Sequence, residues 1–198
     1  IKNNRVEGIE TNTGQTFLGP VILATGHSAR DVYRWLAENN VPIETKGLAV
    51  GVRLEHPSEL IDQIQYHRRE GRGSYLPAAE YSFVTQVKER GVYSFCMCPG
   101  GEIIGCSASP GLVVTNGMSN SLRSGKFANS AVVVDVRVDD FAGAGEPLAG
   151  LVFRGKWEQK AFKAGGGNYC APVQRLTDFL AEKEAVAVGP TSFLPGTK

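Results

Sequence analysis

Short strand-like segments fill the middle of the sequence, and they constrain the fold more than any other feature. The segments YSFVTQV, VYSFCMC and IIGCSA are separated by the turn sequences KERG and PGGE, a pattern typical of antiparallel strands. Two more strands are predicted at LVVTNG and at SAVVVDVRV, where every second residue from Val132 to Val138 is a valine on one face. We therefore predict an α+β fold with a largely antiparallel sheet and flanking helices, and not alternating βαβ units.

Three helical segments flank these strands. One covers residues 28–39, with Ser28 as its N-cap. A second occupies PSELIDQIQYHRREG, with Pro57 near its start and Gly71 at its end. The third covers residues 146–164 and ends at a run of glycines.

The segment GLAVGVRLEH, residues 47–56, alternates in the manner of a strand. Arg53 and Glu55 alternate with apolar neighbours in it. The pattern favours a solvent-exposed strand face for both side chains.

The sequence GPVILATGHSARD combines a short apolar run, a glycine and a helix start. A predicted hairpin precedes it, formed by RVEGIET and QTFLG around the turn TNTG. A strand from Pro20 to Ala24 follows, and Gly26 stands between this strand and the helix. Glycine permits a close approach by a ligand or by another backbone, and a helix start offers unpaired N–H groups. The pattern is equally typical of an ordinary strand-to-helix turn.

The net charge, the N-terminal segment and the number of cysteines limit which partners and which cellular location we expect. Lys and Arg number 21 against 20 Asp and Glu, so we expect neither a nucleic-acid partner nor a membrane partner. The N-terminal IKNNRVEG has no apolar core of a signal peptide, and four cysteines do not form a secreted disulfide framework. We expect a cytoplasmic location.

Since the sequence starts at Ile1 in a strand-like segment, we interpret it as a piece of a longer protein.

Several nucleotide, metal and hydrolase motifs are absent from the sequence. It contains no G-x-G-x-x-G and no G-x-S-x-G, and NSLRSGKF lacks the first glycine and the final Ser or Thr of a P-loop. His27, His56 and His67 have no metal-binding spacing. No metal site is expected, and the sequence identifies no catalytic residue.

The cysteines of the predicted strands allow two interpretations. Cys96 and Cys98 are two residues apart, so both sulfurs should lie on one face. A four-residue hairpin loop would turn Cys106 to the other face, whereas a three-residue loop would align all three sulfurs for a soft metal or a dithiol. The alternative is that these cysteines are small core residues, and the absence of C-x-x-C spacing favours it.

The loop TNGMSNS has the composition of a binding site. Polar edges come from Asn116, Ser119 and Asn120, Gly117 permits a sharp backbone path, and Arg123 can meet an anion. A surface turn with ordinary capping would use the same residues.

Several ordered motifs resemble one known family. TFLGPVILATGHSARD resembles the hydrophobic-run-plus-ATG motif of flavoproteins with two dinucleotide-binding domains, where it follows a β-hairpin and abuts FAD. ATGHSARDVY, GLAVGVRLEHP, YSFVTQV, SFCMCPGGEII and VVTNGMSNSLRSGKFANSAVVV together resemble the uncharacterised FAD-dependent dehydrogenases, over nearly the entire chain. In that family these segments follow the N-terminal FAD fingerprint.

The resemblance implies three parts and two groups of site residues. Residues 1–44 would be a remnant of the FAD-binding domain, 45–180 an inserted substrate or cap domain, and 181–198 a tail leading back to the missing FAD domain. The FAD-binding group would be Ala24, Thr25, Gly26 and His27. The candidates on the substrate side are Asn116, Gly117, Met118, Arg123, Cys96 and Cys98.

The resemblance also implies an FAD-dependent oxidoreductase as the parent protein, acting on a small-molecule substrate that the sequence does not specify. The glycine-rich phosphate loop is absent, so this chain alone is expected to be inactive and to bind no FAD. Two other functions stay open: a non-catalytic binding or interaction module, and a dithiol redox domain using Cys96 and Cys98.

Overall fold

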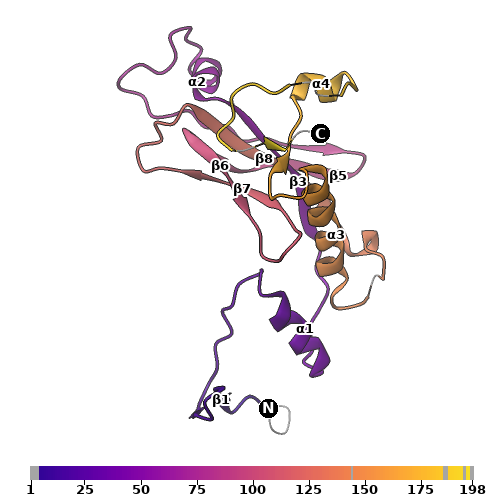
Figure 1. Cartoon of the computed structure of the whole chain (residues 1–198). Helices are drawn as coiled ribbons and strands as arrows, with labels where there is room; N and C mark the ends of the chain where they lie inside the picture. The colour runs from indigo at the N-terminus through magenta and orange to yellow at the C-terminus, as the bar shows by residue number, and fades with distance from the viewer. Residues whose placement is uncertain (1–4, 144, 185–186, 194, 197–198) are drawn as a thin grey trace.

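The computed structural model describes residues 5–143, 145–184, 187–193 and 195–196. The fold is α+β, as predicted, and its centre is a four-stranded antiparallel sheet (Figure 1). In spatial order its strands are β3 (Leu48–Pro57), β8 (Phe127–Val136), β5 (Arg90–Cys98) and β4 (Val84–Val87).

Strand β8 is the centre of the molecule because it has an antiparallel partner on each side. It pairs with β3 along its whole length, from Leu48 opposite Val136 to Pro57 opposite Phe127. Its other edge pairs with β5. The valine-rich sequence suits such a doubly paired strand, and Asn129 and Ser130 on it are completely buried.

The predicted hairpin between VYSFCMC and IIGCSA is wrong. Strand β6 (Gly101–Cys106) pairs instead with β7 (Val114–Ser119), in a separate two-stranded sheet. β8 pairs with one edge of β5, and β4 pairs with the first part of the other edge, from Arg90 to Tyr93. The β6–β7 hairpin packs against β5 and β8.

The predicted helices are present with shifted ends. Helix α2 (Ser58–Tyr66) packs Ile61 against Ala79 and Ala128 in the core and ends at His67, whose φ of 52° is left-handed. It therefore stops before the predicted Gly71. Helix α3 (Ala149–Ala164) starts three residues after the predicted residue 146.

Shorter elements complete the described chain. They are the 3₁₀ helix η1 (Val138–Asp140), helix α4 (Leu176–Leu180), and the parallel pair β9 (Ala171–Pro172) and β10 (Pro195–Gly196).

The N-terminal segment forms the predicted hairpin, β1 (Gly8–Glu10) with β2 (Thr16–Leu18), and helix α1 (Arg30–Glu38). The predicted strand from Pro20 to Ala24 is not a strand, and Ile22 within it is 90% exposed. A buried strand needs neighbours to pair with, and no strand of the described chain lies beside this one. The predicted N-cap is also wrong: Ala29 precedes α1, and the Ser28 hydroxyl lies 3.0 Å from His27 Nδ1.

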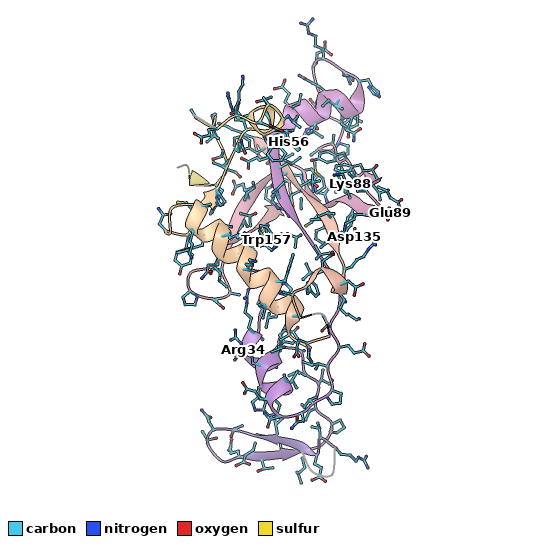
Figure 2. The ribbon with its side chains drawn as sticks, turned by 90° about the vertical axis from the view of Figure 1, so that its right-hand side faces the viewer. Arg34, His56, Lys88, Glu89, Asp135 and Trp157 are labelled. Atoms are coloured by element: carbon cyan, nitrogen blue, oxygen red, sulfur yellow. The ribbon has the colours of Figure 1, made fainter. Side chains whose placement is uncertain are left out.

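An ionic cluster attaches α1 to α3. Arg30 on α1 and Arg154 on α3 both pair with Glu158, whose carboxylate is largely buried. Figures 1 and 2 both show α1 beyond one end of α3, with the β1–β2 hairpin further out.

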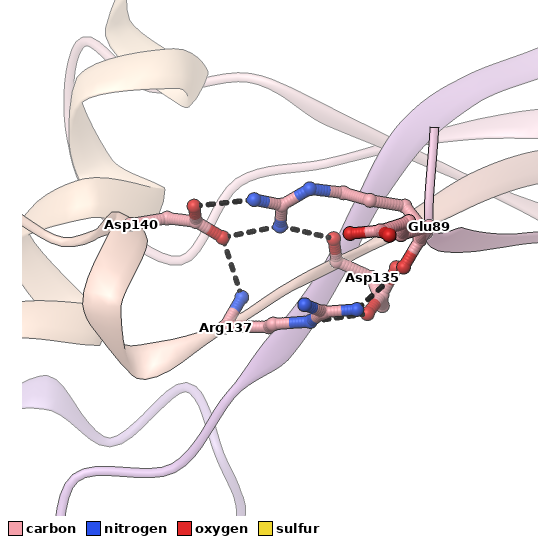
Figure 3. A network of polar contacts seen from close by, with 5 residues as sticks. Glu89, Asp135, Arg137 and Asp140 are labelled. Carbon is pink, nitrogen blue, oxygen red and sulfur yellow. Dashed lines mark hydrogen bonds and ion pairs between the residues drawn. The ribbon is translucent and has the colours of Figure 1, made fainter. Parts of the chain in front are cut away.

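A second ionic network lies where β5 begins and β8 ends (Figure 3). Arg90 on β5 donates from two nitrogens to the Asp140 carboxylate, one of the bonds measuring 2.6 Å. The Arg137 backbone N–H donates to the same carboxylate at 2.7 Å. These bonds, from Arg90 first and Arg137 second, lower the pKa of Asp140 to about 2.

Candidate functional site

The guanidinium of Arg53 gathers polar groups from three other strands. Its Nη1 donates to Asn129 Oδ1 on β8 at 2.6 Å and to the Cys96 carbonyl on β5 at 3.2 Å. Its Nη2 donates to Asn116 Oδ1 on β7 at 3.4 Å. We call Arg53, Cys98, Asn116, Gly117 and Asn129 the Arg53 cluster. Arg53 is half-buried in it, so the prediction of a solvent-exposed strand face is wrong.

Strand register explains why these residues meet. Arg53 lies two positions from Glu55, which is opposite Asn129, and Asn129 is in turn opposite Cys98. Directly opposed residues of antiparallel strands share a face. A bulge between Phe95 and Cys98 interrupts the β5 ladder, and the Cys96 carbonyl at this bulge accepts from Arg53.

Gly117 brings the β6–β7 hairpin down onto the cluster. A Cβ at this position would lie 2.1 Å from Asn129 Oδ1, 2.3 Å from Arg53 Nη1 and 2.8 Å from Cys98 Sγ. Such distances are far inside van der Waals contact. Gly117 lies within β7, so the site uses it for close approach and not for the sharp turn that the sequence predicted.

The cluster has an excess of hydrogen-bond donors and of positive charge. Within the described ranges, no carboxylate lies within 4 Å of the Arg53 guanidinium, and all its acceptors are neutral oxygens. Arg53 Nε and Asn129 Nδ2 are buried, with no partner in the part of the chain that the structure describes. Glu55 is engaged elsewhere, by the backbone N–H and the hydroxyl of Ser192.

The two neighbouring cysteines have different surroundings. Cys96 has a left-handed φ of 52° and is exposed, whereas Cys98 is only 6% exposed. Burial first, and then the neighbouring Cys96 thiol, raises the pKa of Cys98. The core interpretation therefore fits Cys98 and is wrong for Cys96, since the bulge breaks the strand alternation.

The predicted alignments of Cys106 are also wrong. Both depended on a β5–β6 hairpin, which does not form, and Cys106 is exposed on β6. It lines a pocket of about 280 Å³ together with Gly105, Ser107, Val113, Tyr169 and Phe193.

The rest of the TNGMSNS loop lies outside the cluster. Met118 is 63% exposed, and Arg123 pairs with Glu80 at the surface. Ser119 donates to the Pro99 carbonyl at 2.8 Å, and Asn120 accepts from the Ser124 backbone at 3.4 Å. Of this loop, the structure brings only Asn116 and Gly117 to the Arg53 cluster.

The ATG segment forms an exposed edge of the molecule. Ala24, Thr25, Gly26 and His27 are all exposed. Gly26 has a left-handed φ of 79°, and a Cβ added to it would meet no atom within 4 Å. The His27 carbonyl accepts from Arg154 Nη2 on α3 at 3.4 Å, so α3 helps to hold this edge.

A further pair of polar residues lies on the opposite face of the sheet from Arg53. His56, three residues along β3, stacks at a tilt on Tyr81 with a centroid distance of 5.5 Å. Burial lowers the pKa of His56 and raises the pKa of Tyr81. His56 Nε2 is buried and has no partner in the described segments. Neutral His56 thus belongs to the core contact around Tyr81.

Sequence reasoning missed Arg53 and Asn129. Arg53 reads as one polar residue in an alternating strand, and Asn129 falls in the valine-rich segment. Only the pairing of β3 with β8 puts them together. The one signal in the sequence was that Arg53 and Asn129 are polar residues within valine-containing strands.

Neither a metal site nor a membrane-spanning helix is found among the residues that the structure describes. These residues contain no group of three or more His, Cys, Asp or Glu side chains that could hold a metal ion. Among them, no helix is both long enough and apolar enough to cross a membrane.

Fold and site together define an antiparallel α+β domain preceded by a short hairpin-and-helix segment. The chain belongs to the family described as "FAD-dependent protein, C-terminal domain-like", whose profile matches residues 47–198. It is 43% identical over 190 residues to an "Uncharacterized protein" of Clostridium beijerinckii. That alignment covers 95% of this chain and 35% of the relative. The predicted membership of an FAD-dependent family is therefore confirmed.

Proposed function

We propose that this chain forms the substrate side of the flavin site in an FAD-dependent oxidoreductase, a dehydrogenase of the kind that the sequence resembles. The observation that carries the proposal is the Arg53 cluster. It joins four strands within the part of the chain that matches the FAD-dependent family. Buried polar atoms cost free energy unless they are hydrogen-bonded, and Arg53 Nε and Asn129 Nδ2 have no partner in the described residues. Such unsatisfied polar groups would gain partners from a bound ligand.

The proposal divides the chain as the resemblance does. Residues 1–44 belong to an FAD-binding domain, 45–180 form the inserted domain, and 181–198 lead back toward the first domain. The exposure of Val21, Ile22 and Leu23 supports this division, because a strand of such apolar residues is normally covered on both faces. The rest of the parent protein would supply that cover.

The residues Ala24–His27 fit one edge of an FAD site. They are exposed, and open space lies beside Gly26. The glycine-rich loop that binds the pyrophosphate in dinucleotide folds is not in the sequence. These residues can therefore line the cofactor but cannot hold it alone.

When bound, FAD supplies the acceptor for a hydride or for electrons. The chain's own part is to bind and orient the substrate. Arg53 and Asn116 present polar atoms at the rim of the cluster, whereas Asn129 and Cys98 fix its floor. A dithiol mechanism is less suited to this floor, because the raised pKa of Cys98 disfavours the thiolate.

The test is to purify the full-length parent protein and record its visible spectrum and flavin-to-protein ratio. We expect a yellow protein with bound FAD. A colourless, folded parent that takes up no added FAD would overturn the proposal. A thiol-dependent reductase activity in that colourless protein would support the dithiol alternative.

A further inference from the structure

The charge of Arg53 is the starting point. A half-buried guanidinium normally has a carboxylate partner, because an uncompensated charge away from water costs free energy. Arg30 in the same chain is buried and pairs with Glu158. The exposed Arg175 shows the two-bond geometry, since its Nε and Nη2 donate to the two oxygens of Asp178 at 2.6 and 2.7 Å. Arg53 has no such partner in the described ranges.

The bonds that Arg53 does make leave the Nε–Nη2 edge of the guanidinium incompletely hydrogen-bonded, although Nε itself is buried. Nη1 is fully used by Asn129 and the Cys96 carbonyl. Nε has no partner, and Nη2 has only the 3.4 Å bond to Asn116. The Nε and Nη2 atoms form the edge that grips a carboxylate through two parallel bonds, as Arg175 does.

Asn116 contacts the Nη2 end of this edge. Its Oδ1 is placed as one oxygen of an incoming carboxylate would be, and the residue is exposed at the surface. Asn129 Nδ2 adds a second donor without a partner in the described chain, on the amide group that already holds Nη1. Rotation of the Asn116 side chain would free Nη2 for a ligand.

We propose that the Arg53 cluster binds the carboxylate of a small-molecule ligand through Arg53 Nε and Nη2. This inference rests on the proposed function and names its substrate class: a small organic acid. Nη1, Asn129 and the Cys96 carbonyl hold the guanidinium in place. Asn116 is displaced by the ligand.

The experiment uses the full-length parent protein, with sodium acetate as the probe and sodium chloride at matched ionic strength as the reference. We expect acetate to raise the melting temperature and to perturb the flavin absorbance, both saturably. The Arg53→Lys variant should bind acetate roughly tenfold more weakly or worse, since an ammonium cannot make two parallel bonds. Arg68→Lys, at an exposed loop position, is the matched control and should bind as the unchanged protein does.

A second variant keeps the test decisive if Arg53→Lys does not fold. Asn116→Asp places a carboxylate of the same shape beside Nη2, and it still accepts the Gly117 N–H bond that measures 2.9 Å. We expect Asn116→Asp to fold, to melt no lower than the unchanged protein, and to lose its response to acetate.

Two outcomes would overturn the inference. One is a parent protein that binds flavin but responds to acetate no more than to chloride. The other is an equal acetate response in the unchanged protein and in Asn116→Asp. Neither outcome removes the flavin, so both differ from a failure of the proposed function, which would show as a protein without FAD. The melting temperature reports acetate binding whether or not flavin is present.

Discussion

Gly117 leaves the candidate site almost no room for an added atom. The missing Cβ would overlap three groups of the Arg53 cluster, the nearest at 2.1 Å. Two of those groups are fixed by the Arg53–Asn129 hydrogen bond, and Asn129 is completely buried. The hairpin and the sheet therefore hold each other in position at this one residue.

We predict that Gly117→Ala destabilises the protein by about 1–3 kcal/mol, the usual cost of overpacking a close contact. Denaturant unfolding followed by circular dichroism measures this free energy. Gly189→Ala is the matched control, because a Cβ there meets no atom within 4 Å, and it should change stability by less than about 0.5 kcal/mol. Equal effects at both positions would contradict the close packing of β7 on the sheet.

Cys96 and Cys98 should differ sharply in reactivity although one residue separates them. Cys96 is exposed, whereas Cys98 is buried and burial raises the pKa of its thiol. Since the thiolate is the reactive form, iodoacetamide should modify Cys96 in the native protein and Cys98 only after denaturation. Peptide mass spectrometry distinguishes the two. Fast native labelling of Cys98 would show that the floor of the cluster is open.

At the scale of elements, one ionic network joins the start of β5 to the residues that follow β8. The Arg90–Asp140 pair joins the start of β5 to η1, directly after β8 (Figure 3). Arg137 adds a backbone bond to the same carboxylate and a side-chain bond to the Glu89 carbonyl. Asp140 thus connects the start of β5 with the segment that leaves the sheet, and Arg137 connects that segment with the β4–β5 turn.

This contact should make stability depend on pH in the acid range. The folded pKa of Asp140, about 2, lies below the ordinary aspartate value of 3.8. Its stabilising effect is therefore complete above about pH 4 and is lost as the pH falls through 2. Asp140→Asn should lower the melting temperature at pH 6 and flatten its dependence on pH between 4 and 2. Asp139→Asn, at the exposed neighbouring position, should leave the pH dependence of the melting temperature unchanged.

Local patterns predicted most strands and helices, but not which strands would pair. The valine alternation of β8 and the turns KERG and TNTG depend on neighbouring residues, and the predicted elements are present there. The choice between β5–β6 and β6–β7 pairing depends on contacts between residues far apart in the sequence. For the same reason Asn116 and Gly117 were recognisable as site-like, whereas Arg53 and Asn129 were not. The bulge at Cys96 has no local signal in the sequence.

At the scale of the whole molecule, the N-terminal segment and the sheet domain meet at α3. Glu158 pairs with Arg30 of α1 and with Arg154, and Arg154 also donates to the His27 carbonyl. The Glu158 carbonyl accepts from the backbone of Val113, one residue before β7. Helix α3 therefore links the ATG segment to the hairpin that covers the Arg53 cluster.

A substitution at Gly26 can test whether the ATG segment contacts a cofactor. Its φ of 79° alone favours glycine, because other side chains are strained in the left-handed region. Asparagine tolerates that region better than alanine does, so Gly26→Asn separates the backbone requirement from the spatial one. If FAD lies against Gly26 in the full-length parent, Gly26→Asn should fold with a nearly unchanged melting temperature when flavin-free, yet bind far less flavin.

Gly14→Asn is the matched control, since Gly14 also has φ 79° and open space but lies in the β1–β2 turn. We expect the flavin-to-protein ratio to fall only for Gly26→Asn; a normal ratio in that variant would mean that the glycine serves the turn and not the cofactor.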